Sequence, residues 1–296
     1  MNSKFISVLV PVYNQEKYIK ECLDSLDNQT YDNYEVVVLN DGSTDGTAEV
    51  LKQYENNPKF RILFKENERS IAKSRNFLLN EIRGDFFIFV DSDDSVSPVF
   101  LSFLVEALER RNSDIACCNY SLVHVFGGNK EITGYQTMVR KLAIKEMILG
   151  ANGQYMLWNK LIRSDLVKDL KFEQTSFGED FIFIFELMQK DVNVAFISNK
   201  LYAYRYFVNR RKKDVVDLNK RRFLSKLIEM ERDERYSEED RELARTWVVA
   251  TSMFYLTIAK GFYRHILRRN IRVRKDKVGA VVKSLLTRAV KILFGF

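Results

Sequence analysis

The chain has 296 residues, 46% of them hydrophobic and 29% charged, which is the composition of an ordinary globular protein with room for one large domain and an extension. Its net charge of +7 is unevenly distributed, because residues 1–204 carry 23 Lys and Arg against 29 Asp and Glu, whereas residues 205–296 carry 24 against 11. The three cysteines, Cys22, Cys117 and Cys118, do not fit a disulfide framework or a zinc site, and the N-terminus lacks a signal-peptide pattern, so we expect a cytoplasmic protein.

Short apolar runs alternate with helical patterns over the first part of the chain. The runs have the length of strands, and the segments between them place apolar residues three and four positions apart, as helices do. Strands that alternate with helices at this pitch predict βαβ units and a mostly parallel sheet, and therefore an α/β fold. The expected strands are residues 6–12, 34–39, 60–64 and 86–90, and the expected helices are residues 16–26, 48–54 and 70–84.

The alternation of strand-like and helical segments continues to residue 209, and the sequence pattern then changes. Long helical patterns rich in Arg and Lys follow residue 209. We therefore expect an α/β domain at 1–209 and a basic helical region at 210–296. Within the second half of the α/β domain we expect helices at 98–111 and 181–190, and strands at 114–119, 192–197 and 201–206.

Residues 86–94, FFIFVDSDD, are the most informative stretch, because a buried strand ends there in the carboxylates of Asp91, Asp93 and Asp94. Ligands of open α/β sheets bind at the carboxyl ends of the strands. Carboxylates this close repel one another unless a cation lies between them, and oxygen ligands suit Mg²⁺ or Mn²⁺. The pattern predicts a metal site. The alternative is a helix that begins at Pro98 with acids near its N-terminus.

Three further strand ends carry polar loops, at residues 11–14, 40–45 and 67–76. In a parallel sheet these loops share one edge with the acidic motif. The arrangement suits a nucleotide-sugar: the aromatic and apolar first loop faces the base, an acid accepts a hydrogen bond from the base, and Arg75 lies near the phosphates. Each loop alone is more often an ordinary turn, so the prediction depends on their order and spacing.

Five stretches carry a resemblance to a known family: SVLVPVYNQEKYIKECLDSLDNQTY, EVVVLNDGSTDGT, SIAKSRN, FIFVDSDDSVSP and GEDF. Through them, roughly residues 5–206 resemble glycosyltransferase family 2 of the bacterial surface-polysaccharide type, with the GT-A fold. The resemblance implies a Rossmann-like, mostly parallel sheet flanked by helices, here with a C-terminal α-helical extension. It implies a metal-dependent inverting glycosyltransferase with Mn²⁺ or Mg²⁺ as cofactor, a UDP-linked sugar as donor, and a saccharide or polyprenyl-linked saccharide as acceptor.

The resemblance also implies roles for individual residues. Asp41 pairs with the uracil ring, Asp93 binds the metal, and Asp91 contacts the ribose or the metal. Asp180 is the catalytic base that takes the proton of the acceptor hydroxyl, and Glu179 orients the acceptor or supports Asp180. From the residues alone, these two acids cap the helix that follows them equally well. The other implied nucleotide-sugar contacts are Pro11, Val12, Tyr13, Asn14, Ser43, Asp45, Arg75 and Ser92.

Two other classes of protein stay open. A nucleotidyltransferase also combines an α/β sheet with metal-binding carboxylates, although residues 11–15 have neither the glycine nor the lysine of a phosphate-binding loop. The other class is a non-catalytic protein that binds nucleotide-sugars or nucleic acid, and the retained carboxylates argue against it. We expect no nucleic-acid partner.

The C-terminal region is strongly basic, with eleven Lys and Arg and the single acid Asp276 from Lys260 onward. From Val278 to the C-terminus, apolar residues recur at helical spacing. A basic amphipathic helix of this kind lies on anionic membranes without crossing them. We therefore expect a peripheral contact with the inner face of the cell membrane. Packing on the α/β domain or in a dimer, and a solvated basic face without a partner, are the alternatives.

Overall fold

The computed structural model describes residues 3–123, 135–138, 156–175, 178–205, 220–242 and 244–245. The chain divides into two compact units, Met1–Val208 and Asn209–Phe296, and each is described by itself. The assignment of a catalytic role to residues 1–209 and of an extension to residues 210–296 stays a prediction.

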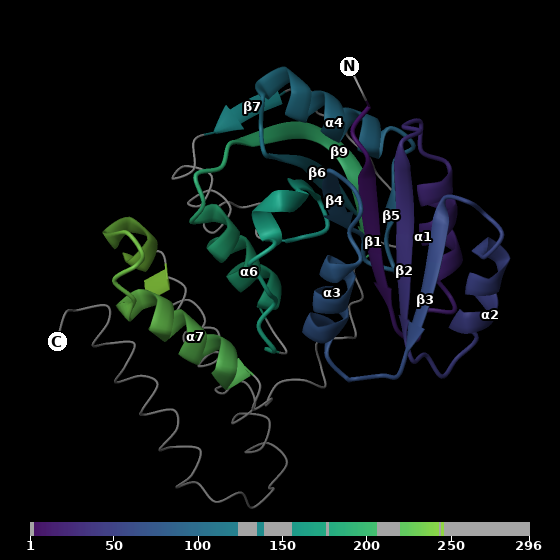
Figure 1. The fold of residues 1–296 in the computed structure, drawn as a ribbon, viewed down its shortest axis with the longest axis horizontal. Coiled ribbons are helices and arrows are strands. Elements are labelled where there is room, and N and C mark those ends of the chain that lie inside the picture. The colour runs from purple at the N-terminus through teal and green to yellow at the C-terminus, as the bar shows by residue number, and fades with distance from the viewer. Residues whose placement is uncertain are drawn as a thin grey trace, which may run out of the picture. The chain divides into compact units, whose positions relative to one another are not determined.

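A nine-stranded sheet forms the first unit (Figure 1). The strands follow the order β3-β2-β1-β4-β8-β6-β9-β5, and β7 pairs with β9 outside this path. Their bounds are Ile6–Val12 for β1, Tyr34–Asp41 for β2, Phe60–Lys65 for β3, Phe86–Phe89 for β4, Ser95–Val96 for β5, Ile115–Val123 for β6, Tyr135–Met138 for β7, Lys160–Arg163 for β8 and Val194–Arg205 for β9.

The order of the sheet reverses at β1, which pairs in parallel with β2 on one side and with β4 on the other. In register, Val12 lies opposite Asn40 and Leu9 lies opposite Phe89, so the loops after these three strands leave the same edge of the sheet. Ligands of open α/β sheets bind at such a reversal point. Strand β8 is antiparallel to β4 and β6, while β6 and β9 are parallel. The predicted mostly parallel α/β fold is confirmed.

Helices cover both faces of the sheet because successive side chains of a strand point to opposite faces. Ile88 of the β4 strand and Val90 just after it join the core cluster that includes residues of α1 and α4. Phe89 points the other way, where its ring contacts Phe172 and the guanidinium group of Arg75 in α3. The helical segments are α1 (Ile19–Asp27), α2 (Thr47–Leu51), η1 (Lys52–Tyr54), α3 (Ile71–Asn80), α4 (Phe100–Arg111), η2 (Ser164–Val167) and α6 (Glu179–Met188).

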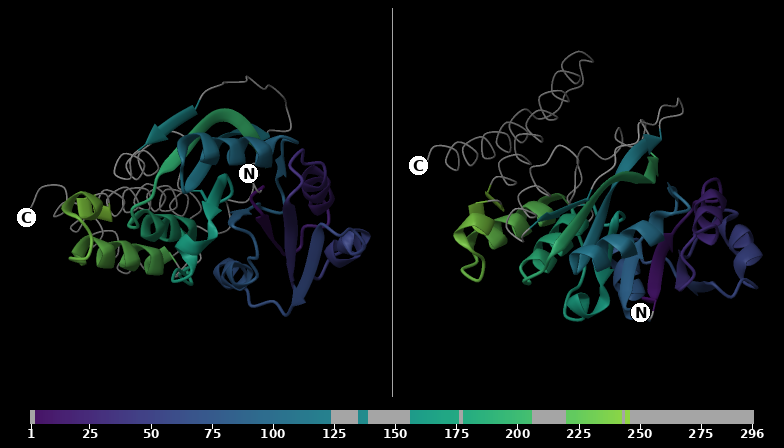
Figure 2. Two further views of the ribbon diagram at one scale, coloured as in Figure 1. Left: turned by 45° about the horizontal axis from the view of Figure 1, so that its top comes forward. Right: turned by 90° about the horizontal axis from the view of Figure 1, so that it is seen from above.

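The structure differs from the prediction in the second half of this unit. The two strands expected at 192–197 and 201–206 are one strand, β9, which curves across the unit with β7 beside it (Figure 2). Its pairing with β6 contains register shifts at Asn119, so the two long strands stay paired as they bend. Strands β5 and β8 were not expected.

In the second unit, α7 spans Lys220–Arg232, which agrees with the helical pattern expected there. The amphipathic segment expected from Val278 lies outside the described residues. Among the residues that the structure describes, no helix combines the length and hydrophobicity needed to cross a bilayer.

Candidate active site

A pocket of about 490 Å³ opens at the carboxyl edge of the sheet, beside the reversal point at β1. Tyr13 stands at its entrance with 47% of its surface exposed, while Val12 behind it is buried. Apolar and polar groups from the loops after β1 and β3 and from the first turn of α3 meet here. The lining residues are Pro11, Val12, Tyr13, Asp41, Asn67, Arg69, Ser70, Ile71 and Ser74.

Asp41 is the buried acid of this pocket. Its Oδ2 accepts a hydrogen bond of 2.9 Å from Ser74 Oγ. Its Oδ1 lies 3.1 Å from Lys65 Nζ as an ion pair, yet receives no aligned hydrogen bond from the described residues. A buried carboxylate oxygen without an aligned hydrogen bond can accept one from a ligand N–H, and contact of Asp41 with a base stays a prediction.

Three of the predicted nucleotide contacts instead join the first loop to the second in this structure. Asn14, with a φ of +52°, donates its backbone N–H to Ser43 Oγ and accepts a 2.7 Å hydrogen bond from Thr44 N. Asp45 accepts from the backbone N–H groups of Thr47 and Glu16. These contacts hold the rim of the pocket in shape. Direct contact of Asn14, Ser43 and Asp45 with a nucleotide stays a prediction.

Arg75 is the centre of a group of carboxylates next to the pocket. Its side chain is 6% exposed and its Nη1 pairs with Glu179 Oε1 at 2.9 Å and with Asp180 Oδ1. Its Nη2 lies 3.5 Å from Asp91 Oδ1. The structure thus places Arg75 against the carboxylates that follow β4 and begin α6, and its predicted position beside the phosphates stays a prediction. Its Nε has no hydrogen-bond partner among the described residues.

The loop that brings α6 to this point is fixed by a pair of hydrogen bonds that the sequence did not reveal. Asn76 donates to Phe172 O at 2.9 Å and accepts from Phe172 N at 2.7 Å. The ring of Phe172 stacks on Phe183 of α6 with 4.1 Å between centroids. Gly178, with a φ of +78°, then turns the chain into α6, a conformation that favours glycine. Glu179 and Asp180 therefore meet the residues after β4.

Burial and mutual repulsion change the acidity of this group. Burial, together with the neighbouring Asp180 carboxylate, raises the pKa of Glu179 to about 7 despite the opposing charge of Arg75. Burial likewise raises the pKa of Asp91 to about 6, where Arg75 opposes the rise and Asp180 and Asp93 add to it. The single positive charge of Arg75 thus offsets the negative charge of these carboxylates only in part.

The pKa of Glu179 predicts a pH dependence of stability. Because this pKa is raised above its ordinary value of 4.5, the folded protein binds more protons than the unfolded chain between about 4.5 and about 7. The contribution of Glu179 to the free energy of unfolding should therefore decrease as the pH rises through this window. We expect Glu179→Gln to remove that decrease and to stabilise the protein at about pH 8 relative to the parent. Urea unfolding across the window measures both, and a parent whose stability rises there would contradict the assignment.

Asp91 and Asp93 are the residues that fit a divalent cation. Among the described residues, no three acidic, His or Cys side chains gather as a complete metal site. Asp91 and Asp93 are one residue apart in the turn that follows β4, and the charge of Asp93 adds to the raised pKa of Asp91. Mg²⁺ characteristically takes one or two protein carboxylates together with substrate phosphates, so this donor set fits such an ion. Ser92 between them is buried, and its contact with a nucleotide-sugar stays a prediction.

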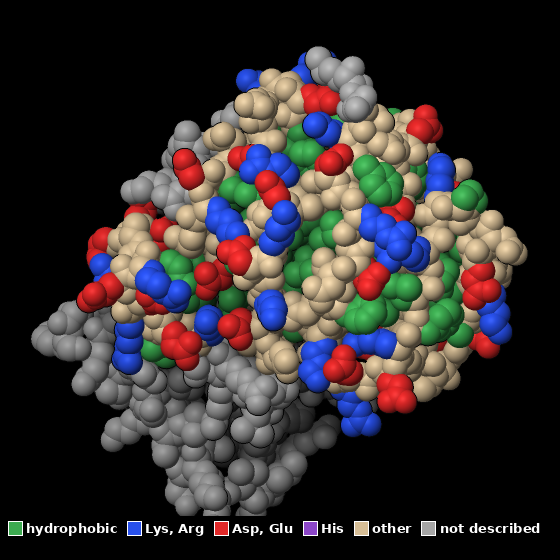
Figure 3. Space-filling model, in the orientation of Figure 1, with side chains coloured by type: hydrophobic (Ala, Val, Ile, Leu, Met, Phe, Trp, Pro, Cys, Tyr) green, Lys and Arg blue, Asp and Glu red, His purple; other side chains and the backbone are tan. Residues whose placement is uncertain are grey.

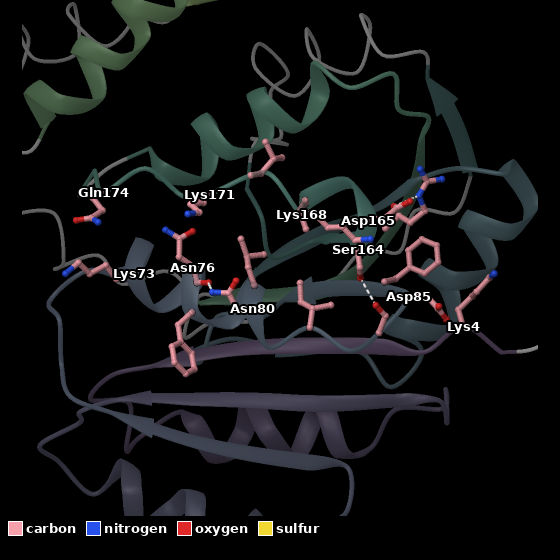
Figure 4. A pocket seen from close by; sticks show the side chains of 18 of the residues that line it. Lys4, Lys73, Asn76, Asn80, Asp85, Ser164, Asp165, Lys168, Lys171 and Gln174 are labelled. Atoms are coloured by element: carbon pink, nitrogen blue, oxygen red, sulfur yellow. Dashed lines mark hydrogen bonds and ion pairs between the residues drawn. The ribbon is translucent and has the colours of Figure 1, made fainter.

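A second, larger cavity of about 1060 Å³ runs between α3 and the segment 163–174 (Figure 4). Figure 4 shows Asn76 and Lys171 reaching toward each other from its two walls. It shares no lining residue with the first pocket. Its lining carries both charge signs, such as Lys168 and Asp165, and Figure 3 shows the same mixture over this face of the described residues. None of the carboxylates paired with Arg75 lines either cavity. Their group is next to the first pocket, because Ser74 of that lining directly precedes Arg75 in α3.

Comparison with known proteins gives the family of this chain. Residues 7–177, more than half of the chain, match the family Glycosyl transferase family 2. Glycosyltransferase GlyA of Streptococcus pneumoniae is 32% identical over 216 residues, which are 68% of this chain and 30% of GlyA. Poly(ribitol-phosphate) beta-N-acetylglucosaminyltransferase TarS of Staphylococcus aureus is 32% identical over 205 residues, which are 67% of this chain and 35% of TarS. The matched part is about a third of each of these curated relatives.

Solved structures show the same fold. The crystal structure of TarS residues 1–349 in complex with UDP-GlcNAc superposes with a TM-score of 0.67 at 22% identity, over 97% of this chain and 81% of that one. The mannosyltransferase PcManGT of Pyrobaculum calidifontis, in complex with GDP-Man and Mn²⁺, gives a TM-score of 0.60 at 16% identity, over 100% of this chain and 88% of that one. With its order reversal at β1 and its acids at the carboxyl edge, the chain belongs to glycosyltransferase family 2 and has the GT-A fold.

Proposed function

We propose that this protein is a metal-dependent, inverting glycosyltransferase. It transfers a sugar from a UDP-sugar to a saccharide or lipid-linked saccharide acceptor during assembly of a cell-surface polysaccharide. The observation that carries the proposal is the group of carboxylates from Asp91, Glu179 and Asp180 around Arg75, beside a pocket that contains an acceptor atom on Asp41. Nucleotide site and candidate base thus meet at one edge of the sheet.

Inversion requires the acceptor hydroxyl to attack the anomeric carbon on the face opposite the departing diphosphate. Asp180 takes the proton of that hydroxyl as the new bond forms. Arg75 holds its Oδ1, so Oδ2 is the atom that accepts the proton. Burial beside Phe172 and Phe89 keeps the Arg75 guanidinium in place. A divalent cation held by Asp91 and Asp93 would stabilise the charge that develops on the leaving diphosphate.

The names of relatives support the choice of substrates. TarS is named for transfer of N-acetylglucosamine to poly(ribitol-phosphate), and its structure has been solved with UDP-GlcNAc. The Mn²⁺ in the PcManGT complex supports the choice of metal. We therefore propose a UDP-hexose or UDP-N-acetylhexosamine donor and a hydroxyl-rich bacterial surface polymer, or its polyprenyl-linked precursor, as acceptor.

Release of UDP tests this function. The purified chain is incubated with UDP-sugars, Mn²⁺ and candidate acceptors, and UDP is followed by a coupled assay. We expect release that depends on the donor and rises when an acceptor is added. No release of UDP, together with release of pyrophosphate in a second reaction that contains UTP and a sugar 1-phosphate, would favour a nucleotidyltransferase. Binding of a UDP-sugar without any turnover would favour a non-catalytic binding protein.

Asp41 should determine donor affinity. Asp41→Ala removes the oxygen that we assign as the hydrogen-bond acceptor for the uracil base of the donor. A hydrogen bond to a charged group contributes about 1.5–3 kcal/mol. The KM for the UDP-sugar should therefore rise roughly 10–100-fold, with a smaller change in kcat. The matched variant Asp41→Asn keeps one acceptor oxygen and should lose less. Steady-state kinetics with varied donor measures both. An unchanged KM in Asp41→Ala would show that Asp41 does not contact the uracil base.

The localisation that we propose is cytoplasmic, peripheral on the inner face of the cell membrane. Residues from Lys260 onward, which lie outside the described residues, should bind anionic liposomes, because each basic side chain near such a surface contributes about 1 kcal/mol. Truncation at Lys260 should abolish flotation with anionic liposomes and preserve transfer to a water-soluble acceptor. Raised salt should weaken binding by the full chain. Equal flotation with neutral liposomes would contradict an electrostatic contact.

A further inference from the structure

The third carboxylate of the acidic motif, Asp94, has no place in the function proposed above. Its side chain does not lie on the rim, because Asp94 is only 1% exposed. Its Oδ2 accepts a 2.8 Å hydrogen bond from the hydroxyl of Tyr202, and its Oδ1 accepts a 2.6 Å hydrogen bond from Arg205 N. Both partners belong to β9, more than a hundred positions later in the chain.

The hydroxyl of Tyr202 joins both ends of the turn formed by residues 91–94. It donates to Asp94 and accepts a 3.1 Å hydrogen bond from Asp91 N. Within the turn, Asp94 N donates to Asp91 O at 3.0 Å. One side-chain oxygen atom therefore bridges the turn, because it donates to one end and accepts from the other.

The side chain of Arg205 fixes the middle of the same turn. Its Nε donates to Asp93 O at 2.9 Å, and its Nη2 pairs with Glu21 Oε2 of α1 at 2.6 Å. The guanidinium group also lies over the ring of Tyr18, 5.0 Å from its centroid. The backbone of each of the residues Asp91, Asp93 and Asp94 is thus contacted from outside the turn or across it, so the turn that carries the carboxylates of Asp91 and Asp93 is fixed in position.

We propose that Asp94, Tyr202 and Arg205 are positioning residues that orient Asp91 and Asp93 for a divalent cation. The inference rests on the proposed function, in which those two carboxylates hold the metal. A cation that receives only two protein ligands depends on their orientation, and groups that orient metal ligands affect affinity strongly. Pairing of Ser95 with Ala203 and of Val96 with Tyr202 already fixes the chain after the turn, so the hydroxyl of Tyr202 acts on the turn itself.

The variant Tyr202→Phe tests this, because it removes one hydroxyl and keeps the ring that stacks on Trp158. Tyr120→Phe is the matched control: Tyr120 packs edge-on against the same Trp158, and among the described residues its hydroxyl forms no hydrogen bond with the turn. Mn²⁺ is titrated into each protein in the presence of UDP by calorimetry. Loss of an orienting contact should weaken Mn²⁺ binding roughly 10–100-fold in Tyr202→Phe, and leave Tyr120→Phe like the parent. UDP binding without metal should be unchanged in both.

Asp94→Asn supplies an independent variant, since the amide removes the charge and one of the two acceptor oxygens. The double variant Tyr202→Phe/Asp94→Asn should weaken Mn²⁺ binding by less than the sum of the two single effects, because the two changes share the contact between the Tyr202 hydroxyl and Asp94. Circular dichroism and thermal unfolding establish that each protein is folded. A folded Tyr202→Phe that binds Mn²⁺ like the parent, or a Tyr120→Phe whose Mn²⁺ binding is equally weakened, would overturn this inference and leave the proposed function intact. A parent that binds no Mn²⁺ with UDP would overturn the metal-dependent function and this inference with it.

Discussion

Asp180→Asn should abolish sugar transfer and leave donor binding intact. A positioned general base typically contributes a factor of about 10²–10⁴ to the rate, and an amide cannot accept the proton of the acceptor hydroxyl. Because Asp180 does not line the nucleotide pocket, the dissociation constant of UDP should change little. Transfer is measured under single-turnover conditions with saturating donor, and UDP affinity by calorimetry. Loss of sugar transfer with unchanged UDP affinity would identify Asp180 as a catalytic base rather than as a residue that binds the donor.

Glu179→Gln is the matched control for that experiment. Glu179 shares Arg75 Nη1 with Asp180 and is similarly buried, so its substitution disturbs the same ion-pair group. If Asp180 alone accepts the proton, Glu179→Gln should retain substantially more activity than Asp180→Asn. Transfer by Asp180→Asn at the parent rate, or equal loss in the two variants, would remove Asp180 from the role of base.

Asp93→Ala should lose nearly all turnover together with metal-dependent binding of UDP. The change removes one of two protein ligands, and a metal that stabilises a developing charge supplies several kcal/mol to the barrier. An excess of chelator should have the same effect on the parent, and added Mn²⁺ or Mg²⁺ should reverse it. Turnover and UDP affinity, each with and without metal, measure the effect.

Asp32→Ala is a suitable control, because this exposed acid lies just before the amino end of β2, away from the carboxyl edge of the sheet. It changes the net charge by the same amount and should leave turnover and metal dependence as in the parent. Full activity of the parent in excess chelator would exclude a metal from the reaction.

The parallel half of the fold could be predicted because its elements have simple local causes. Strands β1 and β2 are buried along their whole length, and most of their residues are apolar. Ser70 caps α3 by accepting a hydrogen bond from Lys73 N, as its position in the sequence indicated. Strand β8 could not be predicted in this way, because it begins with the buried Lys160. Hydrogen bonds from Lys160 Nζ to Met156 O and Asn159 Oδ1 make that burial possible, and no pattern of periodicity contains them.

The candidate site, too, could be predicted only in part from local sequence patterns. Motif order was sufficient to predict that Asp41 and Asp91 belong to one edge of the sheet, whereas Asp180 was assigned to the site only through the family resemblance. It did not reveal that Arg75 pairs with carboxylates more than a hundred positions away, because that contact depends on the path of the segment before α6. Nor could spacing distinguish a polar side chain that faces a ligand from one that braces a loop. For Asn14 the structure shows the second of these roles.

The pocket beside β1 is lined entirely by residues 11–74, whereas the acids at the start of α6 come from a segment that follows residue 175. In the proposed function, recognition of the nucleotide and activation of the acceptor are therefore encoded in non-overlapping stretches of the chain. Under that proposal, a change in the later stretch could alter the acceptor while the nucleotide pocket stays the same. Arg75 sets the condition on such changes, since any altered segment has to present carboxylates to the same guanidinium group.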